Sequence, residues 1–335
     1  MKAPLLETKS LSRNFAVQAS IFGKPRLLKA LDGITISLAP GETLGLAGES
    51  GCGKATLARL LVGLIPPSEG IISFRGKDLS AMGNDERFAF RKNVQMIFQD
   101  PFSSINPRMR VGEIIGEPLT VHRLASGTGR RDRILDLMSK VGLTEDHFTR
   151  YPHEFSGGQR QRIGIARALA VSPEIIIADE PVSALDLSIQ AQIINLLQNL
   201  KLEFGLSFLI IAHDLSVVRH MSDRIAIMYL GKIVEIGERD AVFDGFLHPY
   251  TEALISAIPQ IMPGIGKHRA PLQGDVPSPL SPPTGCQFHT RCPYAQSPIC
   301  MSVIPPLEEK EPNHYCACHF SRELFRNRER DKHLY

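Results

Sequence analysis

No stretch of the sequence approaches the roughly 20 consecutive apolar residues that cross a membrane. Even the apolar segment from Leu57 to Ile65 is short and includes Arg59. The N-terminal residues, MKAPLLETKS, have no apolar core of the kind found in signal peptides, so we expect the chain to stay in the cytoplasm. Strong charge of one sign is also missing: 38 Lys and Arg against 35 Asp and Glu give a net charge of +3, with no basic stripe. Nucleic acid is therefore not expected as a partner.

The composition is that of an ordinary globular protein. Apolar residues make up 43% and charged residues 22% of the 335. At about 150 residues per domain, the chain is long enough for two domains. We expect a first domain over residues 1–258. The rest, 259–335, is expected to be a linker rich in Pro, Gly and Ser up to 283, followed by a cysteine-rich C-terminal extension.

The spacing of apolar residues predicts strands and helices in alternation, which indicates an α/β fold with a mostly parallel core sheet. An inserted helical subdomain is expected over about 107–155, with a turn at 126–129. Strands are predicted within 27–48, over 70–79, 175–178 and 207–212 and as a hairpin over 224–236, and helices over 54–64 and 185–204.

A glycine-rich loop follows the strand that ends near residue 47. Its residues are Gly48, Glu49, Ser50, Gly51, Cys52, Gly53 and Lys54. This is the spacing of a Walker A phosphate loop, in which glycines let successive backbone N–H groups and the N-terminus of the next helix point at phosphate oxygens. Lys54 would neutralise the β- and γ-phosphates.

The residue after Lys54 departs from this motif. A Ser or Thr hydroxyl is expected there as a ligand of Mg²⁺, and the sequence has Ala55. Thr56 lies in the same nucleotide site, but successive residues of a helix point about 100° apart, so its hydroxyl is not expected to replace the missing one. We expect nucleotide binding to be retained and hydrolysis at this site to be slow, with water completing the shell of Mg²⁺.

A second motif, Ser156-Gly157-Gly158-Gln159, opens a helix that carries basic residues. The serine hydroxyl and the N–H groups at a helix N-terminus are suited to holding a γ-phosphate.

Two carboxylates and a histidine follow predicted buried strands. Asp179 and Glu180 come directly after Ile175 to Ala178, at the strand tip where ligands of open α/β sheets bind. Asp179 suits a role close to Mg²⁺, and Glu180 suits a general base for water. His213 follows the strand over 207–212 and is placed to sense a γ-phosphate from the neighbouring tip.

In this order, the motifs resemble those of the nucleotide-binding subunits of ABC transporters. Gln99 within Phe98 to Pro101 and the run Ser183 to Asp186 extend the resemblance over nearly the whole chain. It implies the P-loop ABC ATPase fold, with an antiparallel β subdomain beside the core sheet. The segments FQDPFSSINPR and HPYTEALISAIP and the cysteine-rich end are similar to the ATPase subunits of dipeptide and oligopeptide importers. Nickel importers share parts of them.

The resemblance implies a role for each motif. Phe15 would stack on adenine, at a position where the family often has Tyr. Gln99 would bind Mg²⁺ or the attacking water, Glu180 would be the base, and His213 would be the γ-phosphate switch. The segment Ser156 to Gln159 would complete the ATP site of a partner subunit, because two such domains sandwich two nucleotides head to tail.

The implied cofactors are ATP and Mg²⁺. The implied partners are two transmembrane permease subunits, a second ATPase subunit and an external substrate-binding protein, which puts the chain at the cytoplasmic face of the cell inner membrane as a peripheral subunit. ATP hydrolysis would then drive import of dipeptides or oligopeptides. Three alternatives stay open here: a catalytically weakened regulatory subunit, the ATPase of a nickel importer, and a soluble ABC ATPase not involved in transport.

Five of the six cysteines lie after residue 285. A metal site is conceivable on Cys286, Cys292, Cys300 and Cys318, with Cys316 left over. The close Cys-x-x-Cys pairs usual in zinc sites are absent, whereas thiolates without such pairs can hold an iron–sulfur cluster, as some members of the resembling subfamily are thought to do. The alternative is reduced cysteines that only fill a small hydrophobic appendage.

Overall fold

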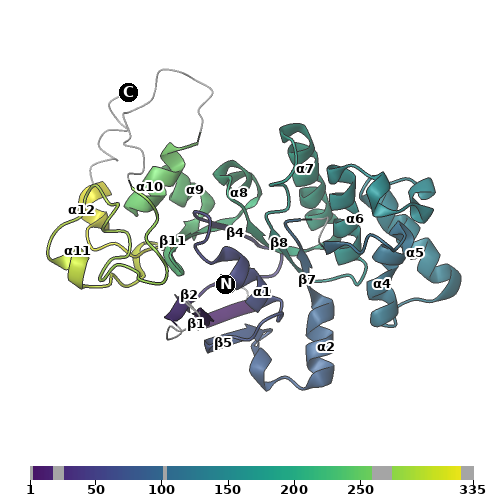
Figure 1. The fold of residues 1–335 in the computed structure, drawn as a ribbon, viewed down its shortest axis with the longest axis horizontal. Helices are drawn as coiled ribbons and strands as arrows, with labels where there is room; N and C mark the ends of the chain where they lie inside the picture. Colours follow the sequence, from purple (N-terminus) through teal and green to yellow (C-terminus); the bar gives the residue numbers. More distant parts are fainter. Residues whose placement is uncertain (1–2, 18–25, 101–103, 259–273, 326–335) are drawn as a thin grey trace.

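The computed structural model describes residues 3–17, 26–100, 104–258 and 274–325 (Figure 1). Most of the predicted linker, residues 259–273, lies outside this described part. Within it, no helix combines the length and the apolar character that a membrane crossing requires.

The central layer is an eight-stranded sheet in the order β12-β13-β11-β10-β4-β9-β8-β7. Its members from β10 to β7 are parallel, and β11, β13 and β12 continue the sheet with antiparallel pairing. The strands are β4 (Thr43–Ala47), β7 (Val94–Ile97), β8 (Ile175–Asp179), β9 (Ser207–Ile211), β10 (Arg224–Tyr229), β11 (Lys232–Glu238), β12 (Glu308–Glu311) and β13 (His314–Cys316).

The two faces of this sheet build two separate cores. Successive side chains of a strand point to opposite faces. In β8, Ile176 and Ala178 accordingly join the core that includes the helical subdomain, while Ile175 and Ile177 join the core on the side of α1 (Lys54–Leu61). All residues of β4, β8 and β9 are buried, as expected for parallel strands covered on both faces.

A smaller antiparallel sheet packs beside α1 (Figure 1). Its strands are β1 (Leu6–Val17), β2 (Arg26–Ile34), β3 (Ser37–Leu38), β5 (Glu69–Phe74) and β6 (Lys77–Asp78). β1 is the centre of this sheet and pairs with β2, β3 and β5. The structure thus confirms the antiparallel subdomain that the resemblance implied.

Helices cover the core sheet and form an inserted subdomain. Helices α4 (Val111–Val121) and α5 (Gly127–Lys140) pack on α6 (Gly157–Leu169), and their shared core includes Ile115, Leu119, Ile134 and Ile163. The other α-helices are α2 (Asn84–Asn93), α7 (Leu187–Phe204), α8 (Leu215–Met221), α9 (Arg239–Asp244), α10 (Pro249–Ser256), α11 (Ile299–Ser302) and α12 (Ser321–Phe325). Short 3-10 turns lie at Leu79–Ala81, Glu145–Thr149 and Pro152–Glu154.

Three local predictions need correction. The single strand over 70–79 is a hairpin, because Arg75 and Gly76 have φ of 50° and 77° and turn the chain between β5 and β6. The turn at 126–129 is instead the start of α5, with Ser126 as the residue before the helix. The helix over 54–64 ends at Leu61, because Gly63 with φ of 72° leaves the helical conformation.

The cysteine-bearing C-terminal residues join the core sheet. β13 pairs with β11, and the Ala317 N–H donates to the Val234 carbonyl at 2.8 Å. His314 Nε2 lies 2.7 Å from Glu235 Oε1, and both side chains are fully buried. Figure 1 shows these residues, in yellow, beside β11.

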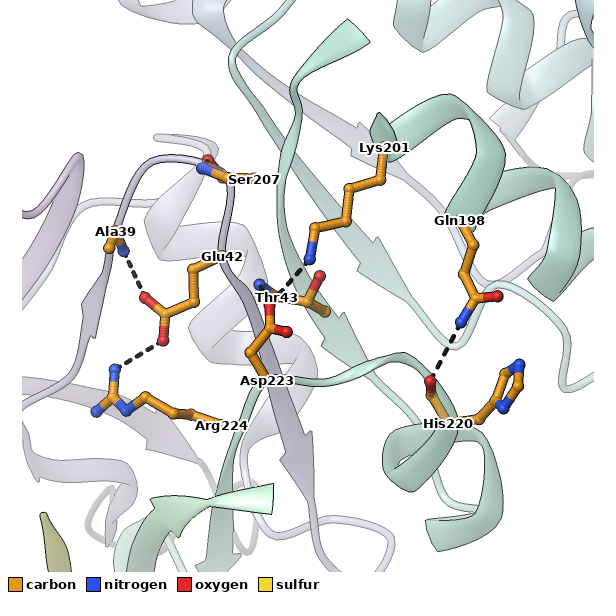
Figure 2. A network of polar contacts seen from close by, with 10 residues as sticks. Ala39, Glu42, Thr43, Gln198, Lys201, Ser207, His220, Asp223 and Arg224 are labelled. Carbon is orange, nitrogen blue, oxygen red and sulfur yellow. Dashed lines mark hydrogen bonds and ion pairs between the residues drawn. The ribbon is translucent and has the colours of Figure 1, made fainter. Parts of the chain in front are cut away.

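At the amino ends of β4, β9 and β10, a polar network holds the strands together (Figure 2). The Asp223 carboxylate accepts hydrogen bonds from the Thr43 N–H at 2.8 Å and from Lys201 Nζ at 2.9 Å. The Glu42 carboxylate accepts from Arg224 at 2.9 Å and from the Ala39 N–H at 2.6 Å. Each of these charges therefore has an opposite charge as partner.

Candidate nucleotide site

The glycine-rich loop lies between the carboxyl end of β4 and the first residue of α1. Gly48 and Gly53 have φ of 153° and 110°. A Cβ on Gly48 would lie 2.2 Å from the Met228 carbonyl oxygen, and one on Gly53 would lie 2.5 Å from the Ala30 carbonyl oxygen. The backbone at both positions leaves no room for a side chain, and no side chain caps the N-terminus of α1. Its N–H groups are therefore free to bind an anion.

Lys54 is buried at this helix start, with 4% of its surface exposed. Its Nζ donates to the carbonyls of Gly48 at 2.7 Å and Glu49 at 2.9 Å and lies 3.8 Å from Cys52 Sγ. No carboxylate in the described part of the chain lies within ion-pair distance of this ammonium group. A buried cation with only neutral partners fits an anionic ligand such as a phosphate group.

Gln99, Glu180 and His213 come together at the carboxyl edge of the same sheet. They follow β7, β8 and β9, which are neighbouring parallel strands, so their tips meet. Gln99 Nε2 donates to Glu180 Oε2 at 2.6 Å, and His213 Nε2 contacts Glu180 Oε1. The sequence placed these three residues in one site, and the structure brings them into contact.

Glu180 has an unusual backbone. Its φ of 48° lies in the left-handed region, which is costly for a residue with a side chain. Its N–H donates to the Ile211 carbonyl at 2.9 Å, and its carboxylate is held by Gln99 and His213. These contacts hold the carboxylate at one position despite the cost.

Asp179, the last residue of β8, is 6% exposed. Burial raises the pKa of Asp179, the nearby Glu180 carboxylate raises it further, and the positive charges of Arg59 and Lys54 oppose the shift. Asp179 ends β8 at the same carboxyl edge of the sheet from which the loop leaves β4. Asp179 and Gln99 supply oxygen atoms, the ligand type that Mg²⁺ prefers.

Ser156 to Gln159 start helix α6 with a capping box. Ser156 Oγ accepts from the Gln159 N–H at 3.3 Å, and Gln159 Oε1 accepts from the Ser156 N–H at 3.1 Å. Figure 1 shows α6 next to the helices at the right of the view, with α1 near the centre. The structure of the single chain does not bring this segment into contact with its own loop.

The other predicted nucleotide contacts lie on β1, in the loop and in the first turn of α1. Phe15 is half-buried on β1, opposite Leu28 of β2, and the Arg13 guanidinium lies 4.7 Å from the centre of its ring. Ala55 and Thr56 are half-buried in the first turn of α1, whereas Ser50 and Gly51 are exposed at the tip of the loop.

Four cysteines line one small cavity in the C-terminal residues. Burial raises the pKa of Cys292 to about 12 and that of Cys318 to about 11, and it also raises the pKa of Cys286. In the described residues, no group of three or more Cys, His, Asp or Glu side chains is arranged to hold a metal ion. The cavity is lined by Cys286, Cys292, Cys300, Cys318, His248, His289, His319 and Tyr294 together with apolar side chains.

Two residues that contact the loop were not singled out from the sequence. Tyr250 Oη accepts a hydrogen bond from the Glu49 N–H at 2.8 Å, and Arg291 binds the Glu49 carboxylate with two hydrogen bonds. Tyr250 lies in the segment HPYTEALISAIP, which indicated the subfamily but gave no role for the tyrosine. Arg291 directly precedes Cys292, and only the cysteine was predicted to have a role, as a metal ligand.

Solved structures with this architecture are ATP-binding cassettes. A structure described as the dimeric post-hydrolysis state of the ATP-binding cassette MJ0796 bound to ADP and Pi is 28% identical, covers 70% of this chain and 98% of its own, and has a TM-score of 0.62. The structure of cbiO1 from Clostridium perfringens, part of the ABC transporter complex cbiONQ, is 26% identical, covers 73% of this chain and 92% of its own, and has a TM-score of 0.63. The fold is thus that of an ATP-binding cassette.

Sequence comparison narrows the class. Residues 31–183 match the ABC transporter family, and residues 234–300 match the C-terminal region of oligopeptide/dipeptide transporters. The oligopeptide transport ATP-binding protein AppF of Bacillus subtilis is 50% identical over 94% of this chain and 97% of its own. OppF of Salmonella typhimurium is 53% identical over 91% and 92%, and the dipeptide transport protein DppF of Escherichia coli is 46% identical over 92% of both. The chain belongs to the ABC transporter family, among the ATP-binding subunits of oligopeptide and dipeptide transporters.

Proposed function

We propose that this chain hydrolyses ATP to drive the import of oligopeptides or dipeptides through a membrane permease. The observation that carries the proposal is the contact of Gln99 and His213 with the Glu180 carboxylate at the sheet edge that also holds the Lys54 loop. The peptide substrate rests on the names of the relatives and on the matched C-terminal region. A nickel importer, a regulatory subunit and a soluble ATPase are not favoured by these relatives.

In this proposal each residue of the site has a separate role in phosphoryl transfer. Lys54 and the loop N–H groups bind and orient the β- and γ-phosphates, and Glu180 accepts a proton from the water that attacks. Gln99 and His213 orient Glu180 and contact that water and the γ-phosphate, while Phe15 stacks on the base. Mg²⁺, when bound near Asp179 and Gln99, neutralises charge on the phosphate oxygens.

The proposed assembly is a dimer of ATPase subunits below two permease subunits, with an external substrate-binding protein. The chain itself lies at the cytoplasmic face of the inner membrane as a peripheral subunit. Ser156 to Gln159 then serve the nucleotide of the partner subunit, in keeping with their position on α6, away from the loop of their own chain.

The test is peptide uptake by the assembled transporter reconstituted in vesicles. Uptake of a labelled oligopeptide or dipeptide should require ATP on the side of this chain and should stop with Glu180→Gln in a complex whose second site is already inactive. Arg322→Gln, on the exposed C-terminal surface, is the matched control. ATP-dependent uptake that continues when this chain is omitted contradicts the proposal.

We also propose an iron–sulfur cluster on Cys286, Cys292, Cys300 and Cys318. The support is that these four cysteines line one cavity, together with His248, His289 and His319, and that cysteine thiolates are the usual ligands of such clusters. Anaerobically purified protein should contain iron and sulfide in similar amounts, which Cys292→Ser should lower and the control Cys316→Ala should leave unchanged, because Cys316 does not line the cavity. Protein with neither iron nor zinc leaves the cysteines as packing residues.

A further inference from the structure

We propose that Arg291 is a positioning residue for ATP binding, because it holds the phosphate loop through the Glu49 carboxylate. Arg291 lies 242 residues from Glu49 in the sequence. Its Nη1 donates to Glu49 Oε2 at 2.6 Å and its Nη2 donates to Glu49 Oε1 at 3.0 Å. This two-point geometry fixes the direction of the carboxylate as well as its charge.

The pair is largely withdrawn from water. The Arg291 side chain is 5% exposed and that of Glu49 is 23% exposed. Hydrogen bonding to the Glu49 carboxylate raises the pKa of Arg291, so this guanidinium stays charged. An ion pair with this degree of burial is screened less by salt than a surface pair.

The backbone of Glu49 is also held by two hydrogen bonds to side chains. Its N–H donates to Tyr250 Oη, and its carbonyl accepts from Lys54 Nζ at 2.9 Å. Tyr250 is fully buried against Phe288, whose ring centre is 5.3 Å away. Residue 49 therefore links the Lys54 ammonium group to α10 and to the C-terminal residues.

The charge of Glu49 explains why the pair matters for nucleotide binding. A carboxylate beside an anion-binding loop repels phosphate unless a cation neutralises it and turns it away. Arg291 does both. Without Arg291, the Glu49 carboxylate would be free to turn toward the loop and compete for Lys54.

The C-terminal residues thereby take part in the ATP site. The Arg291 N–H donates to the Phe288 carbonyl at 3.0 Å, and the Cys292 N–H contacts the His289 carbonyl, so the arginine is built into the turns that carry two of the cavity cysteines. Arg291 thus connects these turns directly to the phosphate loop.

The test measures the Kd of the full-length chain for a fluorescent ATP analogue with Mg²⁺. Arg291→Gln should raise this Kd about 10- to 30-fold, because one partner of a buried charge pair is lost. Arg291→Lys keeps the charge but loses the two-point geometry, so a rise of about threefold is expected. Arg322→Gln, also in the C-terminal residues but exposed, should leave the Kd unchanged.

The decisive variant is the double mutant Glu49→Gln/Arg291→Gln. Because it removes the carboxylate that Arg291 neutralises, its Kd should return to within about threefold of the wild type. A merely structural role for Arg291 predicts instead that the double mutant binds as poorly as Arg291→Gln. That result, or an unchanged Kd in Arg291→Gln, overturns the proposal.

The inference rests on nucleotide binding at the loop, which Lys54→Met tests separately. If the wild type binds the analogue and Lys54→Met does not, failure of the Arg291 variants overturns the positioning role alone. If the wild type does not bind, both proposals fail. Should Arg291→Gln not fold, Arg291→Lys takes its place: its Kd should exceed that of the wild type about threefold, and an unchanged Kd overturns the proposal.

Discussion

The amino and carboxyl edges of the core sheet are built from the same strands but use charge differently. At the amino edge, Asp223 pairs with Lys201 and with the Thr43 N–H, and Glu42 pairs with Arg224 (Figure 2). At the carboxyl edge, the buried Lys54 has only carbonyl and thiol partners.

The carboxyl edge also contains costly backbone conformations. Glu180 at the carboxyl edge has a φ of 48°, and Gly48 and Gly53 have φ values that side chains rarely adopt. Paired groups contribute to the stability of the fold, whereas a buried unpaired cation and a costly backbone reduce it. At the carboxyl edge Glu49 and Glu180 have partners, but Lys54 remains available for an anionic ligand, and the paired groups of the amino edge stabilise the sheet that supports this site.

The largest expected effect is on catalysis at the carboxyl edge. Glu180→Gln removes the proton acceptor but keeps the size of the side chain, so ATP turnover should fall about 10²- to 10⁴-fold while nucleotide binding is retained. The measurement is steady-state ATP hydrolysis by the assembled transporter with its second site disabled. Turnover equal to that of the unmodified complex would falsify the role of Glu180 as base.

The next largest effect is expected when the buried Lys54 cation is removed. Lys54→Met should raise the Kd for ATP by at least about 100-fold, since the charge-assisted contacts with the phosphates are lost in a buried site. Lys201→Met at the amino edge is the matched control and should leave the Kd unchanged. Equal nucleotide affinity in the wild type and Lys54→Met would mean that the phosphates bind elsewhere.

Adding a hydroxyl group at position 55 is expected to have a smaller effect. Ala55→Ser supplies the ligand that the loop lacks, so the Mg²⁺ concentration that gives half-maximal ATP turnover should fall about tenfold. Turnover is measured against Mg²⁺ concentration in the assembled transporter. Identical curves for both versions would show that water replaces the hydroxyl without loss.

The smallest effect on binding is expected at the amino edge, where the change appears in stability. Asp223→Ala leaves the Thr43 N–H without its acceptor and Lys201 without its partner, so the free energy of unfolding should fall by about 1–3 kcal/mol. Denaturant unfolding measures this change, and the Kd for ATP should not move. Asp244→Ala, which removes a surface pair with Arg219 at 3.5 Å, is the control with little effect.

The sequence allowed the carboxyl edge to be predicted because each of its groups follows a buried strand. The loop follows β4, Glu180 follows β8, and His213 comes soon after β9, so the parallel order alone brings them together. Strand β1 was not predicted, because charged and polar residues such as Lys9, Arg13 and Asn14 interrupt its alternation.

Contacts between distant segments left no local pattern. Arg291 lies in a loop region that is rich in cysteine. Nothing in the neighbouring sequence indicates that it pairs with Glu49, 242 residues earlier. The same holds for the burial of His314 against Glu235, which fixes β13 to β11. Such pairs depend on the order of strands in the sheet and could be found only from the structure.

Thermal unfolding of the wild type and of Lys54→Met, each with and without Mg-ATP, tests whether Lys54 is kept without a charged partner in order to bind phosphate. If it is, Mg-ATP at about 100 times its Kd should raise the Tm of the wild type by about 4 °C. Without nucleotide, Lys54→Met should be at least as stable as the wild type, because a buried unpaired charge is removed, and Mg-ATP should not shift its Tm. A Lys54→Met variant that is less stable without nucleotide, or that gains as much from Mg-ATP as the wild type, would contradict the account.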